Sequence, residues 1–150
     1  MTIRTVPLLQ VLIFAALMSV LAFWLPMYQF NGGWTLILSV ILVIIGIALI
    51  VVGGAEFRRC NTTVNPIYPH KTCYLVTRGL YSVSRNPMYL GFLVMLIGWG
   101  FYLGDISNFI ILPIFVYIMN RYQIMPEERV LGEKFGQAYI DYITRVRRWL

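Results

Sequence analysis

Hydrophobic residues run almost without interruption through the first third of the chain. No charged residue occurs between Thr5 and Ala55, which is enough apolar sequence for two membrane crossings of about 20 residues each. The break between the two crossings is 26–33, where Pro, Asn and paired Gly favour a turn and aromatic residues suit a membrane interface. The pattern therefore predicts transmembrane helices at about 6–26 and 34–55. The first apolar run is longer than the core of a cleaved signal peptide, so we expect it to remain as an anchor.

Two further apolar runs lie in the second half of the chain, at 87–103 and 106–122. They are joined by Gly104 and Asp105, which favour a turn. Each run is short for a membrane span, because 17 residues of helix rise only about 25 Å whereas the hydrocarbon core is about 30 Å thick. We therefore expect these two spans either to take in residues at their ends or to lie where the protein thins the bilayer.

The polar segment between the second and third runs is strongly basic. It holds a single acidic residue, Glu56, and five basic residues: Arg58, Arg59, Lys71, Arg78 and Arg85. The positive-inside rule therefore places this segment in the cytoplasm, with both chain termini on the same side. Two prolines, Pro66 and Pro69, argue against a long helix and favour an ordered loop. Cys60 and Cys73 are expected to be free thiols, and His70, the only histidine, a solvated loop residue.

The last segment, 126–149, has apolar residues at helical spacing and basic residues on the other faces. The apolar positions are Leu131, Phe135, Ala138, Tyr139, Tyr142, Val146 and Trp149. This pattern predicts an amphipathic helix that lies on the cytoplasmic interface. Pro126 suits the first helical position, and Glu127 and Glu128 then fall in the first turn, where the helix dipole favours carboxylates.

Composition agrees with this pattern. Hydrophobic residues make up 59% of the chain and charged residues only 12%, which is far from the balance of a soluble domain. We therefore predict one domain, 1–150, that is all-α and polytopic in the membrane, with about four transmembrane helices.

The net charge of +6 comes from basic residues beside apolar runs, so anionic membrane lipid is the expected partner and nucleic acid is not. No spacing of cysteine and histidine suggests a metal site, and no protein partner is implied.

Polar side chains gather on the cytoplasmic side of the third and fourth runs. Because those two spans are antiparallel and joined by a short turn, 75–91 and 121–149 are brought together. A site made from these two segments is open both to soluble cofactors and to lipophilic molecules from the bilayer. Its candidate residues are Arg78, Tyr81, Arg85, Asn86, Tyr89, Arg121, Glu127 and Glu128.

Three ordered motifs in the second half of the chain point to a known family. They are T-R-G-L-Y at 77–81, R-N-P-M-Y-L-G at 85–91 and E-E-x-x-L-x-x-x-F-G-x-x-Y-x-x-Y at 127–142. In this order they resemble the isoprenylcysteine carboxyl methyltransferase family of integral membrane enzymes, and the Asn-Pro-Met-Tyr core with its distal Glu pair is also similar to phospholipid N-methyltransferases. The resemblance covers about 62–149, whereas the first two spans match only as hydrophobic segments.

The resemblance implies methyl transfer from S-adenosyl-L-methionine. Carried over by position, the expected cofactor contacts are Gly79, Tyr81, Arg85, Asn86, Pro87, Tyr89, Glu127 and Glu128. Asn86 stands where many relatives have histidine, so it can orient a cofactor by hydrogen bonding but cannot carry a proton near neutral pH. The family's Val-Pro-Arg-Trp ending is present as Val146, Arg147, Arg148 and Trp149, without the proline.

The residue types suit this chemistry. A sulfonium zwitterion with an adenine ring needs acceptors for its amino and ribose groups, a cation for its carboxylate and an aromatic or apolar slot. Transfer is an in-line displacement, so catalysis depends chiefly on alignment and on excluding water. The catalytic candidates are Arg121, to hold an acceptor carboxylate, and Glu128, to take the proton of an acceptor amine. The expected acceptor is a lipophilic or amphiphilic small molecule that reacts through a carboxylate, an amine or a thiol.

Two other functions fit the same pattern. One is a membrane reductase with a nicotinamide cofactor, because sterol reductases resemble this family in their carboxy-terminal core. The other is a non-enzymatic membrane assembly partner, since Gly46, Gly53 and Gly54 suit close packing of helices. In that case the glutamates are only a first helical turn and the arginines only topology signals.

Overall fold

The computed structural model describes residues 7–30, 32–59 and 75–150, and within them the chain is helical, with isolated bridges in place of a sheet. The helices in order are α1 (Pro7–Trp24), α2 (Gly33–Arg59), η2 (Gly79–Ser82), α3 (Pro87–Leu103), η3 (Ile106–Ile110), α4 (Ile111–Met119), η4 (Asn120–Ile124), α5 (Met125–Phe135) and α6 (Gln137–Arg145). This all-α architecture confirms the predicted fold class. Cys60, His70 and Cys73 lie outside the described residues.

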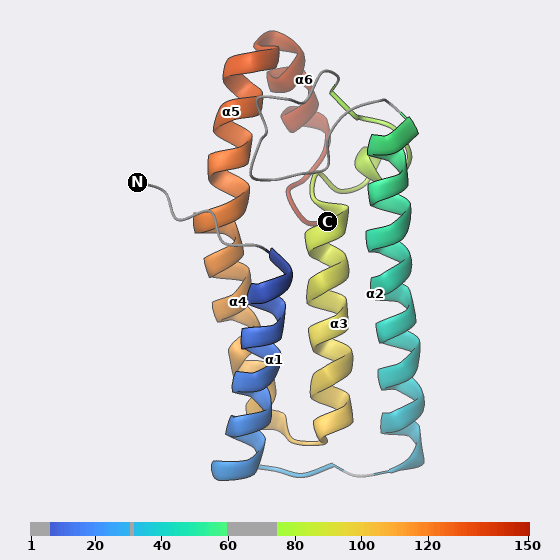
Figure 1. Cartoon of the computed structure of the whole chain (residues 1–150), viewed down its shortest axis with the longest axis vertical. Coiled ribbons are helices and arrows are strands. Elements are labelled where there is room, and N and C mark those ends of the chain that lie inside the picture. The colour runs from blue at the N-terminus through green and yellow to red at the C-terminus, as the bar shows by residue number, and fades with distance from the viewer. Residues whose placement is uncertain (1–6, 31, 60–74) are drawn as a thin grey trace.

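The long helices run side by side along the long axis of the molecule (Figure 1). α3 is the central element, because α1, α2 and α4 all pack against it. α4, η4 and α5 form one continuous column in which η4 is a π-helical turn, a feature that is often found at functional sites. The helical segments at the upper end of Figure 1, η2 and α6, lie on the side where α3 begins and α2 ends.

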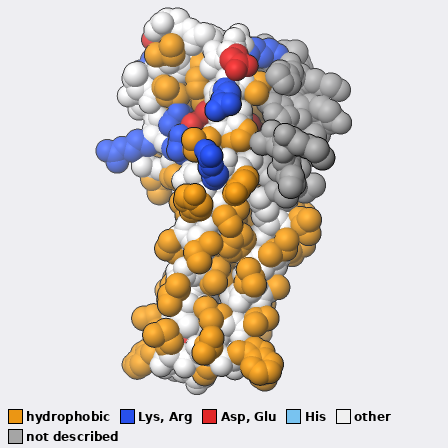
Figure 2. All heavy atoms as spheres, turned by 90° about the vertical axis from the view of Figure 1, so that its left-hand side faces the viewer, with side chains coloured by type: hydrophobic (Ala, Val, Ile, Leu, Met, Phe, Trp, Pro, Cys, Tyr) orange, Lys and Arg blue, Asp and Glu red, His pale blue; other side chains and the backbone are white. Residues whose placement is uncertain are grey.

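Length and composition of the helices fit a membrane protein. Within the described residues, three helices are long and apolar enough to cross a bilayer: Pro7–Trp24, Gly33–Arg58 and the column Ile106–Phe135. α3 is a shorter apolar helix of 17 residues. The face seen in Figure 2 carries apolar side chains over its lower part and clusters of Lys and Arg above them. This division matches an apolar part within lipid and a basic part at its surface. We call the apolar lengths of α1, α2, α3 and α4 the stem, and we call η2, the first turn of α3, α5, α6 and residues 146–150 the head.

Glycine allows α2 and α3 to lie in close contact. A Cβ atom on Gly91 would lie 2.6 Å from the carbonyl oxygen of Gly46, and one on Gly46 would lie 2.6 Å from the carbonyl oxygen of Gly91. Farther down the pair, a Cβ atom on Gly98 would lie 3.0 Å from the carbonyl oxygen of Ser39. The two backbones therefore approach too closely for larger side chains, as in other small-residue interfaces of membrane helices.

The two connections at the far end of the bundle are hydrogen bonded to each other. Gly104 ends α3 with a φ of 66°, and its carbonyl oxygen accepts a hydrogen bond from the amide of Phe30 at 2.8 Å. Asp105, which is buried, accepts hydrogen bonds from the amides of Ser107 at 2.9 Å and Met27 at 3.3 Å. The α3–η3 turn thus fixes the position of the segment between α1 and α2.

The carboxy-terminal segment is divided into two helices, whereas the apolar pattern predicts one. The division is at Gly136, whose φ of 52° lies in the region that favours glycine. α5 continues the column of α4 upward, and α6 turns back over the head of the molecule (Figure 1). The last residues then return to the start of α3, where Ser84 and Arg147 form a parallel bridge.

Candidate functional site

The head of the molecule brings together the two polar segments that the sequence places on one side of the membrane. One side of the site consists of η2 and the first turn of α3. The other consists of α5, α6 and residues 146–150, which we call the carboxy-terminal strap. Direct contacts between Glu127, Glu128, Arg85 and Tyr89 join the two sides.

Glu128 is the centre of the charged part of the site. Its Oε1 lies 3.0 Å from Nη1 of Arg85, and its two oxygens also accept hydrogen bonds from Nε and Nη2 of Arg148 at 3.1 and 2.6 Å. The Arg148 contact is therefore a bidentate, charge-assisted pair. The hydrogen bond to Glu128 raises the pKa of Arg148. Two guanidinium groups thus share one carboxylate, which leaves the cluster with a net positive charge.

Arg85 has capacity for a further ligand. Its side chain is 13% exposed, and its Nε has no hydrogen-bond partner among the described residues. Its backbone amide donates to the carbonyl oxygen of Arg147 at 3.0 Å. A buried donor that lacks a partner is costly. Because two guanidinium groups share the single carboxylate of Glu128, the cluster suits a further anionic group beside Arg85.

Glu127 is paired with an aromatic residue of α3. The hydroxyl of Tyr89 donates to Oε2 of Glu127 at 3.1 Å, and Tyr89 itself is buried. Tyr89 lies in the first turn of α3, which begins at Pro87, a residue suited to the first helical position. Consecutive glutamates of α5 therefore have different partners, one a tyrosine and the other two arginines.

η2 supplies a buried aromatic residue. The ring of Tyr81 packs edge-on against Phe57 at 5.2 Å, and its backbone carbonyl accepts a hydrogen bond from the hydroxyl of Tyr142 at 2.6 Å. Burial raises the pKa of Tyr81 well above its usual range, and the charge of Glu127 adds to this effect. Gly79 begins η2 with a φ of 59°, and a Cβ atom there would lie 2.8 Å from Oε1 of Glu56. Its positive φ therefore favours glycine at this position, whereas the Glu56 side chain could shift to make room for a Cβ atom.

Asn86 holds the carboxy-terminal strap. Its side-chain Nδ2 donates to the carbonyl oxygen of Arg148 at 3.0 Å, and its backbone amide donates to Oγ of Ser84 at 3.2 Å. The strap is also held by Trp149, whose Nε1 donates to Oδ1 of Asn120 at 3.0 Å. Asn86 thus orients Arg148, which in turn contacts Glu128.

Arg121 and Arg78 are not brought into this cluster. Arg121 lies on η4 and is exposed, and within the described part of the chain it forms no ion pair with Glu127 or Glu128. Arg78 is also exposed, directly before η2. The role of Arg121 toward an acceptor therefore stays a prediction from the sequence.

Three residues that lie at the candidate site were not among the candidates from the sequence, because the carboxy-terminal tail was interpreted as a surface helix. Arg148 pairs with Glu128, and Tyr139 and Tyr142 of α6 are buried against the head. Burial and the charge of Glu128 raise the pKa of Tyr139 to about 12, although a hydrogen bond from Arg85 opposes the shift. The signal in the sequence was Gly136, a helix-breaking residue in the middle of the expected helix.

The donor set is suited to an organic zwitterion. Glu127 and Glu128 supply acceptors, Arg85 supplies a cation, and the tyrosines supply aromatic surface. Among the described residues, no group of three or more His, Cys, Asp and Glu side chains is placed to hold a metal ion.

Comparison with known proteins identifies the family. A model of the family described as phospholipid methyltransferase matches residues 34–138, more than two thirds of the chain. Protein-S-isoprenylcysteine O-methyltransferase B of Arabidopsis thaliana is 35% identical over 72 residues, which are 48% of this chain and 36% of that protein. Protein-S-isoprenylcysteine O-methyltransferase A of the same plant is 29% identical over 108 residues, or 67% of this chain and 55% of that protein.

Another match is to an uncharacterized protein of Haemophilus influenzae, which is 41% identical over 63 residues, 42% of this chain and the whole length of that protein. The chain thus spans about a third to just over half the length of the two plant methyltransferases. No solved structure gives a significant match. Because the family model covers more than half of the chain, the chain belongs to the phospholipid methyltransferase family, and it is also similar to the isoprenylcysteine O-methyltransferases named above.

Proposed function

We propose that the protein transfers a methyl group from S-adenosyl-L-methionine to a lipophilic or amphiphilic acceptor at the cytoplasmic face of the membrane. The observation that carries this proposal is the cluster of Tyr89 with Glu127 and of Arg85 with Glu128, in a chain of a methyltransferase family. Each of these residues stands at a position that the family motifs assign to the cofactor.

The residues of the head fit such a donor. Arg85, which shares the carboxylate of Glu128 with Arg148, suits the carboxylate of the methionine part. Glu127 is half-buried and suits the hydroxyl or amino groups of the donor. Tyr81 and Tyr89 add aromatic surface beside them. When bound, the donor supplies an electrophilic methyl group on a positively charged sulfur.

The chain's own contribution is positioning. Glu128 and the strap residue Arg148 hold the guanidinium of Arg85 in place through an ion-paired network. Alignment of reacting groups is worth several kcal/mol of a barrier when it is fixed before reaction. The buried tyrosines of η2 and α6 restrict water at the cluster. In this proposal Glu128 has two roles: it positions the guanidinium of Arg85, and it contacts the cofactor.

The acceptor is proposed from the relatives. Their names specify a phospholipid and an isoprenylcysteine, both of which combine a polar group with a long apolar part. Arg121, exposed on η4, is available to hold an acidic group of such a molecule. If the acceptor reacts through an amine, Glu127 or Glu128 is the candidate to take its proton.

The test is calorimetric titration of the detergent-purified protein with S-adenosylmethionine and S-adenosylhomocysteine. We expect both to bind, and Glu128→Gln to weaken binding about tenfold or more, because charge-assisted hydrogen bonds contribute about 1.5–3 kcal/mol. Glu133→Gln is the matched control, since Glu133 is exposed on the same helix α5.

Tyr89→Phe is a second variant in case Glu128→Gln does not fold, and we expect a smaller loss of affinity from it. Binding of NADPH in place of the sulfur cofactors would contradict the proposal and favour a reductase. A folded protein that binds none of the three would also contradict it and favour a non-enzymatic membrane role.

A further inference from the structure

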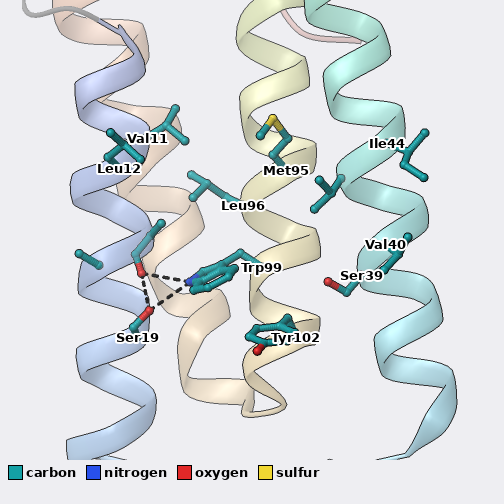
Figure 3. Close-up of a pocket in the computed structure, with 13 residues that line it drawn as sticks. Val11, Leu12, Ser19, Ser39, Val40, Ile44, Met95, Leu96, Trp99 and Tyr102 are labelled. Atoms are coloured by element: carbon teal, nitrogen blue, oxygen red, sulfur yellow. Dashed lines mark hydrogen bonds between the residues drawn. The ribbon is translucent and has the colours of Figure 1, made fainter.

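A groove opens between α1 and α2 in the apolar stem. α1 and α2 each lie along α3, which forms the floor of the groove (Figure 3). Its volume is about 620 Å³, within the usual range of ligand sites. Leu12 and Ala16 line it from α1, Val40 and Ile44 from α2, and Met95 and Trp99 from α3.

The groove presents hydrocarbon to its opening. On the α1 side the polar atoms are paired, because Nε1 of Trp99 donates to the carbonyl oxygen of Ala15 at 3.1 Å and to Oγ of Ser19 at 3.2 Å. Ser19 in turn donates to the same carbonyl oxygen at 2.9 Å. Figure 3 shows this network on the α1 side, with Tyr102 at the lower end of the groove. The other polar side chains of the lining are Ser39 and Tyr102, so an apolar ligand in the groove meets mainly hydrocarbon and displaces none of the hydrogen bonds of Trp99.

The groove runs along the helices and suits part of a hydrocarbon chain. Its α1 wall runs from Val11 to Ser19, a rise of about 12 Å at 1.5 Å per residue. Its α3 wall runs from Met95 to Tyr102, a rise of about 10 Å. A chain that lies lengthwise in the groove therefore contacts α1, α2 and α3 together.

The groove lies along α3 at a short distance below the proposed cofactor site. Met95, near its upper end, follows Tyr89 on α3 by six residues, a rise of about 9 Å. Tyr89 contacts Glu127 of the proposed cofactor site. An amphiphile whose polar group lies at that site therefore has its chain at the depth of the groove.

We propose that the groove between α1 and α2 binds the hydrocarbon chain of the methyl acceptor, so that the acceptor is a long-chain amphiphile that enters sideways from the bilayer. This inference rests on the proposed function for the identity of the acceptor. It assigns a binding role to α1 and α2, which carry none of the family motifs.

The test is photo-crosslinking in detergent with a lysophosphatidylethanolamine that carries a diazirine near the end of a palmitoyl chain. We expect crosslinks on peptides that contain 11–19, 39–44 and 95–102, and we expect unlabelled lysophosphatidylethanolamine to compete for them. Ala16→Trp fills the groove and is expected to reduce these crosslinks about tenfold, the equivalent of about 1.4 kcal/mol. Ala48→Trp is the matched control, because Ala48 is an exposed residue of α2 outside the groove.

Crosslinks spread evenly over the exposed faces of the helices would overturn the proposal, as would equal effects of the two tryptophan variants or a lack of competition. Titration of S-adenosylmethionine into the same variants separates this inference from the proposed function. If both variants bind the cofactor normally and only Ala16→Trp loses the crosslinks, the groove proposal is supported. If neither the variants nor the original protein binds the cofactor while the crosslinks stay in the groove, the proposed function fails and the groove is overturned as an acceptor site.

Discussion

At the scale of single residues, the charged cluster depends on Glu128. Arg85 and Arg148 both contact its carboxylate, so its charge offsets the repulsion between two guanidinium groups. The three side chains are 13–34% exposed, and water therefore screens part of their interaction. Removing the charge of Glu128 while keeping its shape would leave two neighbouring cations without a counter-charge, which is why Glu128→Gln is expected to affect both stability and cofactor binding.

Tyr139 gives a prediction for alkaline pH. Its pKa is raised from 10.0 to about 12, first by burial and then by the charge of Glu128. Because the folded state favours the neutral phenol, its contribution to stability is fully present below pH 10 and is lost as pH rises through about 12. We expect near-ultraviolet circular dichroism of the folded head to decline within this range. Tyr139→Phe, which has no proton to lose, should show a smaller decline, and identical profiles would contradict the assignment.

At the scale of helices, the α2–α3 contact depends on glycine. Gly91→Ala would place a methyl group 2.6 Å from the carbonyl oxygen of Gly46 and 2.8 Å from Ile50. The two helices would have to separate, so we expect a destabilisation of about 1–3 kcal/mol, typical of overpacking. The measurement is thermal unfolding in detergent, followed by circular dichroism.

Gly54→Ala is the control for this prediction. Gly54 lies on α2, and a Cβ atom there meets nothing within 4 Å. Because alanine is favoured over glycine in a helix by about 0.5–1 kcal/mol, this variant should be as stable as the original protein or more stable. If the two variants unfolded at the same temperature, close packing at Gly91 would not be the reason for its glycine.

The carboxy-terminal strap holds helices of the head together. Residues 146–150 have no helical structure, yet they are held by Asn86, by the amide of Arg85 and by Asn120. These contacts lie at the start of α3 and on the π-helical turn η4. The strap therefore links the two columns that carry the site, and it places Arg148 against Glu128.

At the scale of the whole molecule, the two ends of the bundle differ in charge. The head carries the clusters of Lys and Arg above the apolar stem (Figure 2), whereas Asp105 is the charged residue among the described residues in the turns at the opposite end. We predict that the head faces the cytoplasm, because basic residues are retained on that side.

Single-cysteine labelling in intact bacterial cells tests this orientation. In a background with Cys60→Ser and Cys73→Ser, we expect a membrane-impermeant maleimide to label Gln29→Cys, in the connection at the far end. Arg145→Cys, at the end of α6, should be labelled only after the cells are permeabilised. The reverse pattern would show that the head faces outward.

The sequence alone was sufficient for the fold class and for the expectation that several of the candidate residues lie close together. An uncharged stretch from 5 to 55 has no stable place except lipid, and helices satisfy backbone hydrogen bonds there. The short turn at Gly104 and Asp105 made two antiparallel helices the expected arrangement. For that reason the local pattern was enough to predict that 75–91 lies close to Glu127 and Glu128.

Other features depend on contacts between residues far apart in the chain. The apolar spacing of the tail is the same whether its tyrosines face lipid or a protein surface, so the pattern did not distinguish an interfacial helix from α6 packed on the head. The pairing of Arg148 with Glu128 requires the chain to reverse at Gly136 and return to Asn86. The groove likewise exists because α1 and α2 pack on different sides of α3, and the periodicity of uniformly apolar helices does not specify which faces meet.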